Sequence, residues 1–169
     1  MIRLPVWLKN EDHRLLYLVN LKFKCQLLDW WMPKITHLGG AVCSIGAALL
    51  LLCLGDAGQD GLIALAASHL LVQVLKINFS RRRPYLADDN VHLSHHPLRD
   101  YSFPSGHATA VFTLATILSL TFPWFSLLLI PLSGAVGISR IYLGLHYPTD
   151  VGVGAVIGMA FAIGTHLLT

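Results

Sequence analysis

The sequence predicts an all-α integral membrane protein, a helical bundle of about five transmembrane helices with an amphipathic helix at its N-terminal end. Hydrophobic residues make up 54% of the 169 positions and charged residues only 12%, whereas about 25% of a typical soluble domain is charged. The apolar residues are concentrated in long uncharged stretches, as in membrane spans. The polar residues gather in short clusters at the ends of these stretches. The length is that of a single domain, 1–169.

The N-terminal segment, 1–34, is predicted to lie in the membrane interface. Its apolar stretch from 15 to 23 is interrupted by Lys22, followed by Lys24, and closed by Trp30 and Trp31. Tryptophans at one end and lysines on one side are typical of an amphipathic helix that lies in the interface. A sixth transmembrane helix is the alternative for this segment.

Five hydrophobic stretches follow, each long enough to form a helix. The first covers about 37–54, and a polar turn at 55–60 separates it from the second, at about 62–75. The third covers about 105–122, and Pro123 and Trp124 form a tight turn into the fourth, which ends near 142. The fifth runs from about 148 to the end of the chain. Such boundaries are accurate to about 2–4 residues.

Three polar clusters lie at the ends of these helices, at 76–84, 104–107 and 139–150. In an up-and-down bundle, the end of an even-numbered helix lies on the same face as the start of the next helix. We therefore expect all three clusters to meet at one membrane face. The polar loop 78–103 joins the second and third helices at the same face.

The basic residues of these clusters predict an anion site. Arg83 and Arg140 can each grip phosphate oxygens with a planar guanidinium, and Lys76 adds a compact charge. Such residues at a membrane face usually mark a ligand or an ion pair. For Arg81 and Arg82, an interfacial anchor that reaches toward lipid headgroups is the favoured interpretation.

The second cluster is typical of a helix start. Ser105 is a suitable N-cap, and Gly106 lets the backbone approach a ligand closely. The free N–H groups of a first helical turn bind anions. His107 lies in that turn, where it could donate a proton to a leaving group.

The third cluster predicts an activated histidine. Pro148 suits the first turn of the last helix, which places Asp150 in the same turn. A carboxylate there can accept from the imidazole of His146, which fixes its tautomer and raises the basicity of the other ring nitrogen. His146 would then attack phosphorus and form a phosphohistidine intermediate.

Other site types are not supported by the sequence. His92, His95 and His96 stand near acidic residues but match no regular ligand spacing, so we expect a solvated loop and no metal. The three cysteines have no partner at metal-ligand spacing and are expected to be small buried side chains. The basic residues are too local for a nucleic-acid surface.

The clusters together resemble a known family. Lys76 precedes Arg83-Pro84 by six intervening residues, Pro104-Ser105-Gly106-His107 follows, and Ser139-Arg140 is followed by five residues before His146 and three more before Asp150. This pattern resembles, at every position, the three-part motif of the type 2 phosphatidic acid phosphatase superfamily. The resemblance implies a lipid phosphatase that needs no metal or other cofactor. It assigns phosphate binding to Lys76, Arg83, Arg140, Ser105 and Gly106, proton donation to His107, nucleophilic attack to His146, and orientation of His146 to Asp150.

The expected substrate is the phosphomonoester or diphosphate of a membrane lipid. The N-terminal region, with Leu28-Asp29, Met32 and Thr36 to Gly40, more weakly resembles small bacterial members that act on undecaprenyl pyrophosphate or phosphatidylglycerophosphate. We expect undecaprenyl pyrophosphate as the substrate, with phosphatidylglycerophosphate or phosphatidic acid as alternatives. Rival functions are a lipid phosphotransferase, a vanadate-dependent haloperoxidase, and a non-enzymatic channel or scaffold. The last leaves the convergence of two histidines, a carboxylate and three cations unexplained.

The orientation in the membrane rests on two opposing arguments. The arginine-rich loop favours the cytoplasmic side under the positive-inside rule. The resemblance implies a bacterial cytoplasmic membrane with the site on the extracytoplasmic face. We expect the extracytoplasmic face, because the positive-inside rule does not apply to arginines that serve a binding site. The oligomeric state is not predicted.

Overall fold

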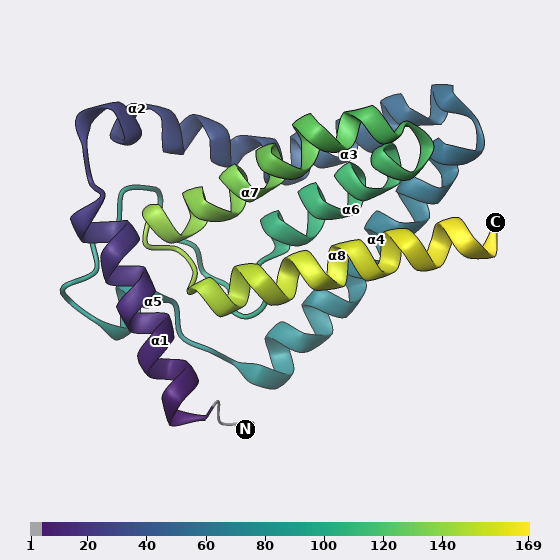
Figure 1. Ribbon diagram of the computed structural model, residues 1–169. Coiled ribbons are helices and arrows are strands. Elements are labelled where there is room, and N and C mark those ends of the chain that lie inside the picture. Colours follow the sequence, from purple (N-terminus) through teal and green to yellow (C-terminus); the bar gives the residue numbers. More distant parts are fainter. Residues whose placement is uncertain (1–4) are drawn as a thin grey trace.

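The computed structural model describes residues 5–169, in which every regular element is helical. Four helices form the body of the bundle: α4 (Asp56–Phe79), α6 (Gly106–Thr121), α7 (Ser126–Tyr142) and α8 (Pro148–Leu168). Figure 1 shows them side by side, with α3 (Ala41–Leu51) on the upper side. The predicted fold class, an all-helical membrane bundle, is confirmed. The predicted number of spans is not confirmed.

Helix α6 lies at the centre of this bundle and packs against α8, α7, α4 and α3. It has many buried residues, and several of them are alanines and threonines. The close approach of α8 depends on glycine: a Cβ at Gly158 would lie 2.4 Å from the carbonyl oxygen of Thr109. Small residues at such interfaces let helix backbones come near each other in a membrane.

Among the described residues, three helices are long and apolar enough to cross a membrane. They are 56–87, 123–142 and 148–168. A fourth candidate is a pair of helical segments, Gln26–Gly39 and Ala41–Leu54, bent by 49° at its break. Helix α6 is apolar but shorter. The count of five spans therefore remains a prediction.

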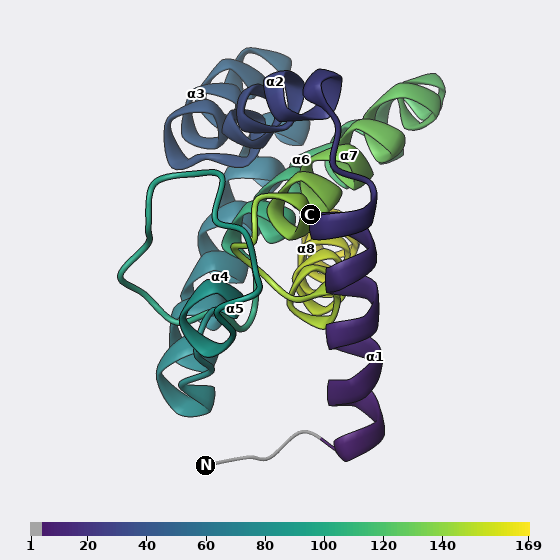
Figure 2. The ribbon, with the colours of Figure 1, turned by 90° about the vertical axis from the view of Figure 1, so that its left-hand side faces the viewer.

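The N-terminal segment is not one helix. Helix α1 (Val6–Tyr17) continues into a π-helical turn, Leu18–Lys22, and α2 (Gln26–Ile35) follows after a break. Figure 2 shows α1 standing beside the bundle and α2 lying near α3 at its top. Residues 1–4 of the predicted interfacial segment lie outside the described residues, and the placement of the segment in the interface stays a prediction.

The polar turn predicted at 55–60 is wrong, because α4 already begins at Asp56. The chain reverses at Gly55, whose φ is +69°, a conformation that suits glycine. Gly58 belongs to the helix and serves close packing, because a Cβ there would lie 2.0 Å from the carbonyl oxygen of Leu51. At its other end α4 runs past Lys76 to Phe79 and stops at Ser80, which is left-handed with a φ of 45°.

A long connection joins α4 to α6 and contains one short helix, α5 (Pro84–Ala87). It lies at the end of the bundle where α7 ends and α8 begins, next to α1 (Figures 1 and 2). The C-terminus lies at the opposite end of α8 (Figure 1). The fold thus brings the polar clusters to one end.

Candidate active site

The structure brings all eight predicted site residues together. Six of them line one cavity of about 200 Å³: Lys76, Arg83, Gly106, His107, Arg140 and His146. The other two lie behind its wall, where the backbone N–H of Ser105 donates to the carbonyl oxygen of Asp150 at 2.9 Å. The eight residues come from α4, the loop after it, the start of α6, the end of α7 and the segment that begins α8, as the order of the hydrophobic stretches led us to expect.

Arg140 is 1% exposed and incompletely paired. Its Nη1 donates to Oγ1 of Thr36 at 2.8 Å, while Nε and Nη2 have no partner among the described residues. A buried guanidinium without partners for its N–H groups is costly, because those donors lose their water without replacement. Nε and Nη2 therefore lack an acceptor in the described part of the chain, and an anionic oxygen is the strongest acceptor for a guanidinium.

Arg83 is also 1% exposed and is held from three sides. Its Nε donates to the carbonyl oxygen of Asp100 and its Nη1 to that of Leu145, both at 2.8 Å. The same Nη1 lies 3.2 Å from Nε2 of His146. A guanidinium can only donate, so Nε2 is the acceptor and the ring proton of a neutral His146 is on Nδ1.

Asp100 was not predicted as part of the site. Its carboxylate accepts hydrogen bonds from Nζ of Lys76 at 2.8 Å and from Nη2 of Arg83 at 2.7 Å. Partial burial raises the pKa of Asp100, but the hydrogen bonds and charges of Lys76 and Arg83 outweigh it and lower the pKa to about 2. The carboxylate therefore occupies the cations that the sequence assigned to phosphate.

The start of α6 has the predicted local structure. The side chain of Ser105 accepts from the backbone N–H of Ala108, and His107 lies in the first turn. A Cβ at Gly106 would lie 3.8 Å from Nε2 of His69, so the helix start faces α4 closely. The free N–H groups and the positive end of the helix dipole favour an anion at this place.

His146 and Asp150 are neighbours, but they do not form the direct hydrogen bond that the sequence led us to expect. Nδ1 of His146 lies 3.6 Å from Oδ2 of Asp150, beyond hydrogen-bond length. Ser102 sits between them: its hydroxyl donates to Oδ2 and lies 3.5 Å from Nδ1. Ser102 was missed because it lies 44 and 48 residues away along the chain.

His146 is 2% exposed, between α7 and α8. Burial, followed by the positive charges of Arg83 and Arg140, holds the pKa of His146 well below its ordinary value. The imidazole is therefore neutral near pH 7, which is the form that can attack an electrophile.

The role predicted for Arg81 also differs from its place in the structure. Its side chain is only 15% exposed, and its Nη1 lies 2.6 Å from Oδ1 of Asp150. The interpretation of Arg81 as an interfacial anchor is therefore wrong. Arg82, given the same interpretation, is exposed.

In residues 5–169, no group of three or more His, Cys, Asp or Glu side chains is arranged to hold a metal ion. His92 and His96 are exposed in the loop, while His95 is partly buried. The three cysteines are also exposed, so the prediction that they are buried is wrong. In a membrane protein, apolar side chains on the outside of helices lie against lipid.

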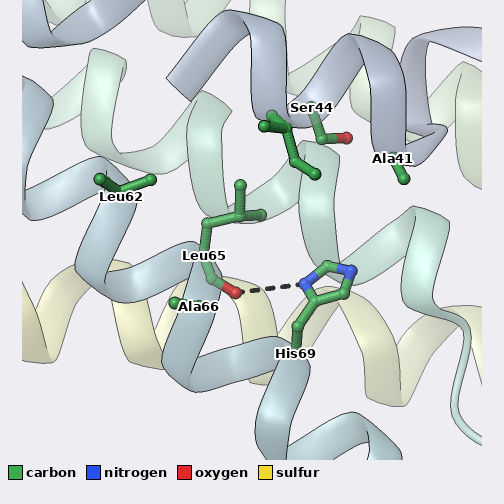
Figure 3. A pocket seen from close by; sticks show the side chains of 7 residues that line it. Ala41, Ser44, Leu62, Leu65, Ala66 and His69 are labelled. Atoms are coloured by element: carbon green, nitrogen blue, oxygen red, sulfur yellow. Dashed lines mark hydrogen bonds between the residues drawn. The ribbon is translucent and has the colours of Figure 1, made fainter. Parts of the chain in front are cut away.

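A second, apolar cavity of about 290 Å³ lies between α3 and α4. Figure 3 shows its lining, in which leucine and alanine side chains surround one imidazole. Nδ1 of His69 lies 3.2 Å from the carbonyl oxygen of Leu65. His69 and Ala41 line both this cavity and the polar one, so the two adjoin.

Comparison with known proteins places these features in a family. The structure of LpxE from Aquifex aeolicus superposes with a TM-score of 0.85 at 30% identity, over 92% of this chain and 94% of that one. Phosphatidylglycerophosphatase B of Bacillus subtilis is 34% identical over 145 residues, 76% of this chain and 68% of its own. An undecaprenyl-diphosphatase of Sulfolobus acidocaldarius is 37% identical over 97 residues, 57% of this chain and 47% of its own.

The chain spans about half the length of several curated relatives, the Sulfolobus protein among them. The family model of the PAP2 superfamily matches residues 60–169, which include every motif of the polar cavity. The protein is thus an integral membrane member of the PAP2 superfamily.

Proposed function

We propose that the protein is a phosphatase that releases orthophosphate from a membrane lipid through a phosphohistidine intermediate. The observation that supports this most directly is the buried Arg140, whose Nε and Nη2 have no partner within residues 5–169, beside a neutral His146 in the same cavity. A site for a channel or scaffold would not need unpaired guanidinium donors next to an imidazole.

The reaction has two displacements. Lys76, Arg83 and Arg140 hold the nonbridging oxygens, and Nε2 of His146 attacks phosphorus as the bond to the lipid oxygen breaks. His107, which is protonated once the phosphate anion lies beside it, donates its proton to that oxygen. His107 then takes a proton from water, which attacks the phosphohistidine, breaks the P–N bond and releases orthophosphate.

Asp150 and Ser102 orient the nucleophile. Nδ1–H of His146 faces the hydroxyl of Ser102 and Oδ2 of Asp150, which stabilise the imidazole cation that forms on attack. Ser105 and Gly106 add backbone donors at the start of α6. Lys76, Arg83 and Arg140 supply the positive charge, so the reaction as proposed needs no metal ion.

The apolar cavity is proposed to hold the lipid chain. It adjoins the polar cavity at His69 and Ala41, so a chain lying between α3 and α4 brings its phosphate to the cations. We propose undecaprenyl pyrophosphate as the leading substrate, on the extracytoplasmic face of a bacterial cytoplasmic membrane. Lipid A 1-phosphate is a second candidate, favoured by two relatives that are lipid A 1-phosphatases, each 33% identical over 105 residues.

The test is orthophosphate release by the purified protein in detergent with EDTA. Undecaprenyl pyrophosphate, phosphatidylglycerophosphate, phosphatidic acid and lipid A 1-phosphate are compared in parallel. His146→Ala should reduce release to background, whereas His92→Ala, an exposed loop histidine, should not. Equal release by the His146→Ala protein would refute the mechanism. Transfer of the phosphoryl group to an added alcohol without orthophosphate would identify a phosphotransferase.

A further inference from the structure

Arg81 joins the catalytic end of the bundle to the N-terminal helix. Its Nη1 lies 2.6 Å from Oδ1 of Asp150 on α8, and its Nη2 lies 2.7 Å from Oδ2 of Asp12 on α1. Its guanidinium carbon stacks 3.8 Å from the ring centroid of Tyr147. A planar guanidinium held by two carboxylates and an aromatic face has little freedom to move.

Asp12 is the buried carboxylate of this arrangement that comes from α1. Its side chain is fully buried, although it lies on a helix with many exposed residues. Besides Arg81, it accepts from the backbone N–H of Thr149 at 2.9 Å and from Oγ1 of Thr149 at 2.5 Å. Thr149 is in the first turn of α8, so Asp12 caps the helix that begins with the catalytic segment.

The two oxygens of Asp150 have separate partners. Oδ1 accepts a hydrogen bond from Nη1 of Arg81, while Oδ2 accepts from the backbone N–H of Tyr147 at 2.9 Å and from the hydroxyl of Ser102. Oδ2 is also the oxygen nearest Nδ1 of His146. Because each oxygen is fixed from its own side, the carboxylate cannot rotate about its Cβ–Cγ bond, and Oδ2 stays turned toward His146.

We propose that Arg81, held by Asp12, is a positioning residue that fixes the carboxylate of Asp150 and, through it, the imidazole of His146. This inference rests on the proposed function of His146 as nucleophile. The N-terminal helix is then a part of the catalytic apparatus, because α1 supplies the carboxylate that anchors Arg81.

The arrangement also balances charge. Asp12 and Asp150 are both fully buried, and Arg81 is the cation that contacts them both. Removing one partner of a buried ion pair leaves an uncompensated charge, which is strongly unfavourable. Without Arg81, Asp150 should lose either its charge or its orientation, and the imidazole cation that forms during attack would lose its stabilisation.

The first test compares Arg81→Met with Arg82→Met, its exposed neighbour. We expect Arg81→Met to lower kcat by about 100-fold, the effect of a small displacement of a catalytic group. KM should stay within about threefold, because the phosphate-binding cations are untouched. Arg81→Lys should restore part of kcat, and Arg82→Met should resemble the unchanged protein. Loss of kcat with an equal rise in KM, or no loss, would overturn the proposal.

The second test asks whether Asp12 acts through Arg81. Asp12→Asn keeps an oxygen that can accept from Thr149 but removes the charge that holds Arg81. It should lower kcat by about tenfold alone and by less than about twofold in the Arg81→Met background, since residues of one network are not additive. Glu11→Gln, an exposed neighbour, is the control. Full additivity would contradict the coupling.

A third measurement does not depend on turnover. Nitrogen-15 NMR of histidine-labelled protein, with His146 assigned by its His146→Gln variant, should show one neutral tautomer with the proton on Nδ1. Arg81→Met should change that spectrum, whereas Arg82→Met should not. An unchanged His146 signal in Arg81→Met would overturn the positioning role. Failure of the proposed function would appear separately, as full activity of His146→Ala.

Discussion

Asp100 contacts Lys76 and Arg83, two of the cations that we propose for phosphate binding, so Asp100→Asn should strengthen the binding of orthophosphate. The carboxylate lies 2.8 Å from Nζ of Lys76 and 2.7 Å from Nη2 of Arg83. Its side chain is 53% exposed, so solvent weakens both pairs. A partly exposed ion pair contributes about 0.5–1 kcal/mol, which gives about 1–2 kcal/mol for two such pairs. This corresponds to about 5- to 30-fold tighter binding once the competitor is removed.

The assay is product inhibition of lipid hydrolysis by orthophosphate at low ionic strength. We expect the inhibition constant to fall about 5- to 30-fold in Asp100→Asn, with a smaller change at high salt because exposed charges are screened. Asp89→Asn, an exposed acid in the same loop, should leave the constant unchanged. An unchanged or weakened inhibition in Asp100→Asn would refute the competition and would indicate that Asp100 holds Lys76 and Arg83 in place for substrate.

Three further outcomes are expected. Gly158→Ala should destabilise the protein by about 1–3 kcal/mol, because its Cβ would meet the carbonyl oxygen of Thr109. Gly152→Ala, with open space around its Cβ, should stabilise the protein by about 0.5–1 kcal/mol. Thermal unfolding in detergent compares the two variants. Because the pKa of His146 is held below its ordinary 6.5 by burial and by nearby guanidiniums, the unfolded chain binds the extra proton below that pH. Stability should therefore fall as the pH drops below about 6.5, and less steeply in His146→Gln, as unfolding at several pH values would show. EDTA should leave hydrolysis unchanged and vanadate should inhibit it; loss of activity with EDTA that returns with one metal would contradict the proposed chemistry.

The convergence of the polar clusters could be predicted from the sequence, because it depends only on the order of the hydrophobic stretches. Helix ends alternate between two faces whatever the exact boundaries are, so errors such as the misplaced start of α4 did not affect the outcome. The residues with formal charge or a ring nitrogen were also recognisable, since few such groups occur in an apolar chain.

The partners of these residues could not be predicted in the same way. Asp12 meets Thr149 across 137 residues, and Thr36 meets Arg140 across 104. Such contacts depend on how α1 and the segment before α3 pack on the bundle, which no local pattern describes. Ser102 is a single hydroxyl in a loop, and nothing in its neighbours along the chain distinguishes it from a solvated serine.

The backbone that carries Arg81, Arg82 and Arg83 leaves the helix for reasons that the sequence partly contained. Helix α4 stops at the left-handed Ser80, and Pro84 disfavours helical backbone at the residue before it. Arg83 is accordingly extended, with φ −69° and ψ 152°. The chain between Ser80 and Pro84 is not helical. It leaves Arg83 1% exposed and the side chain of Arg81 15% exposed, whereas Arg82 is exposed. The three adjacent arginines accordingly have different surroundings: Arg83 lines the polar cavity, Arg82 is exposed, and Arg81 contacts Asp150.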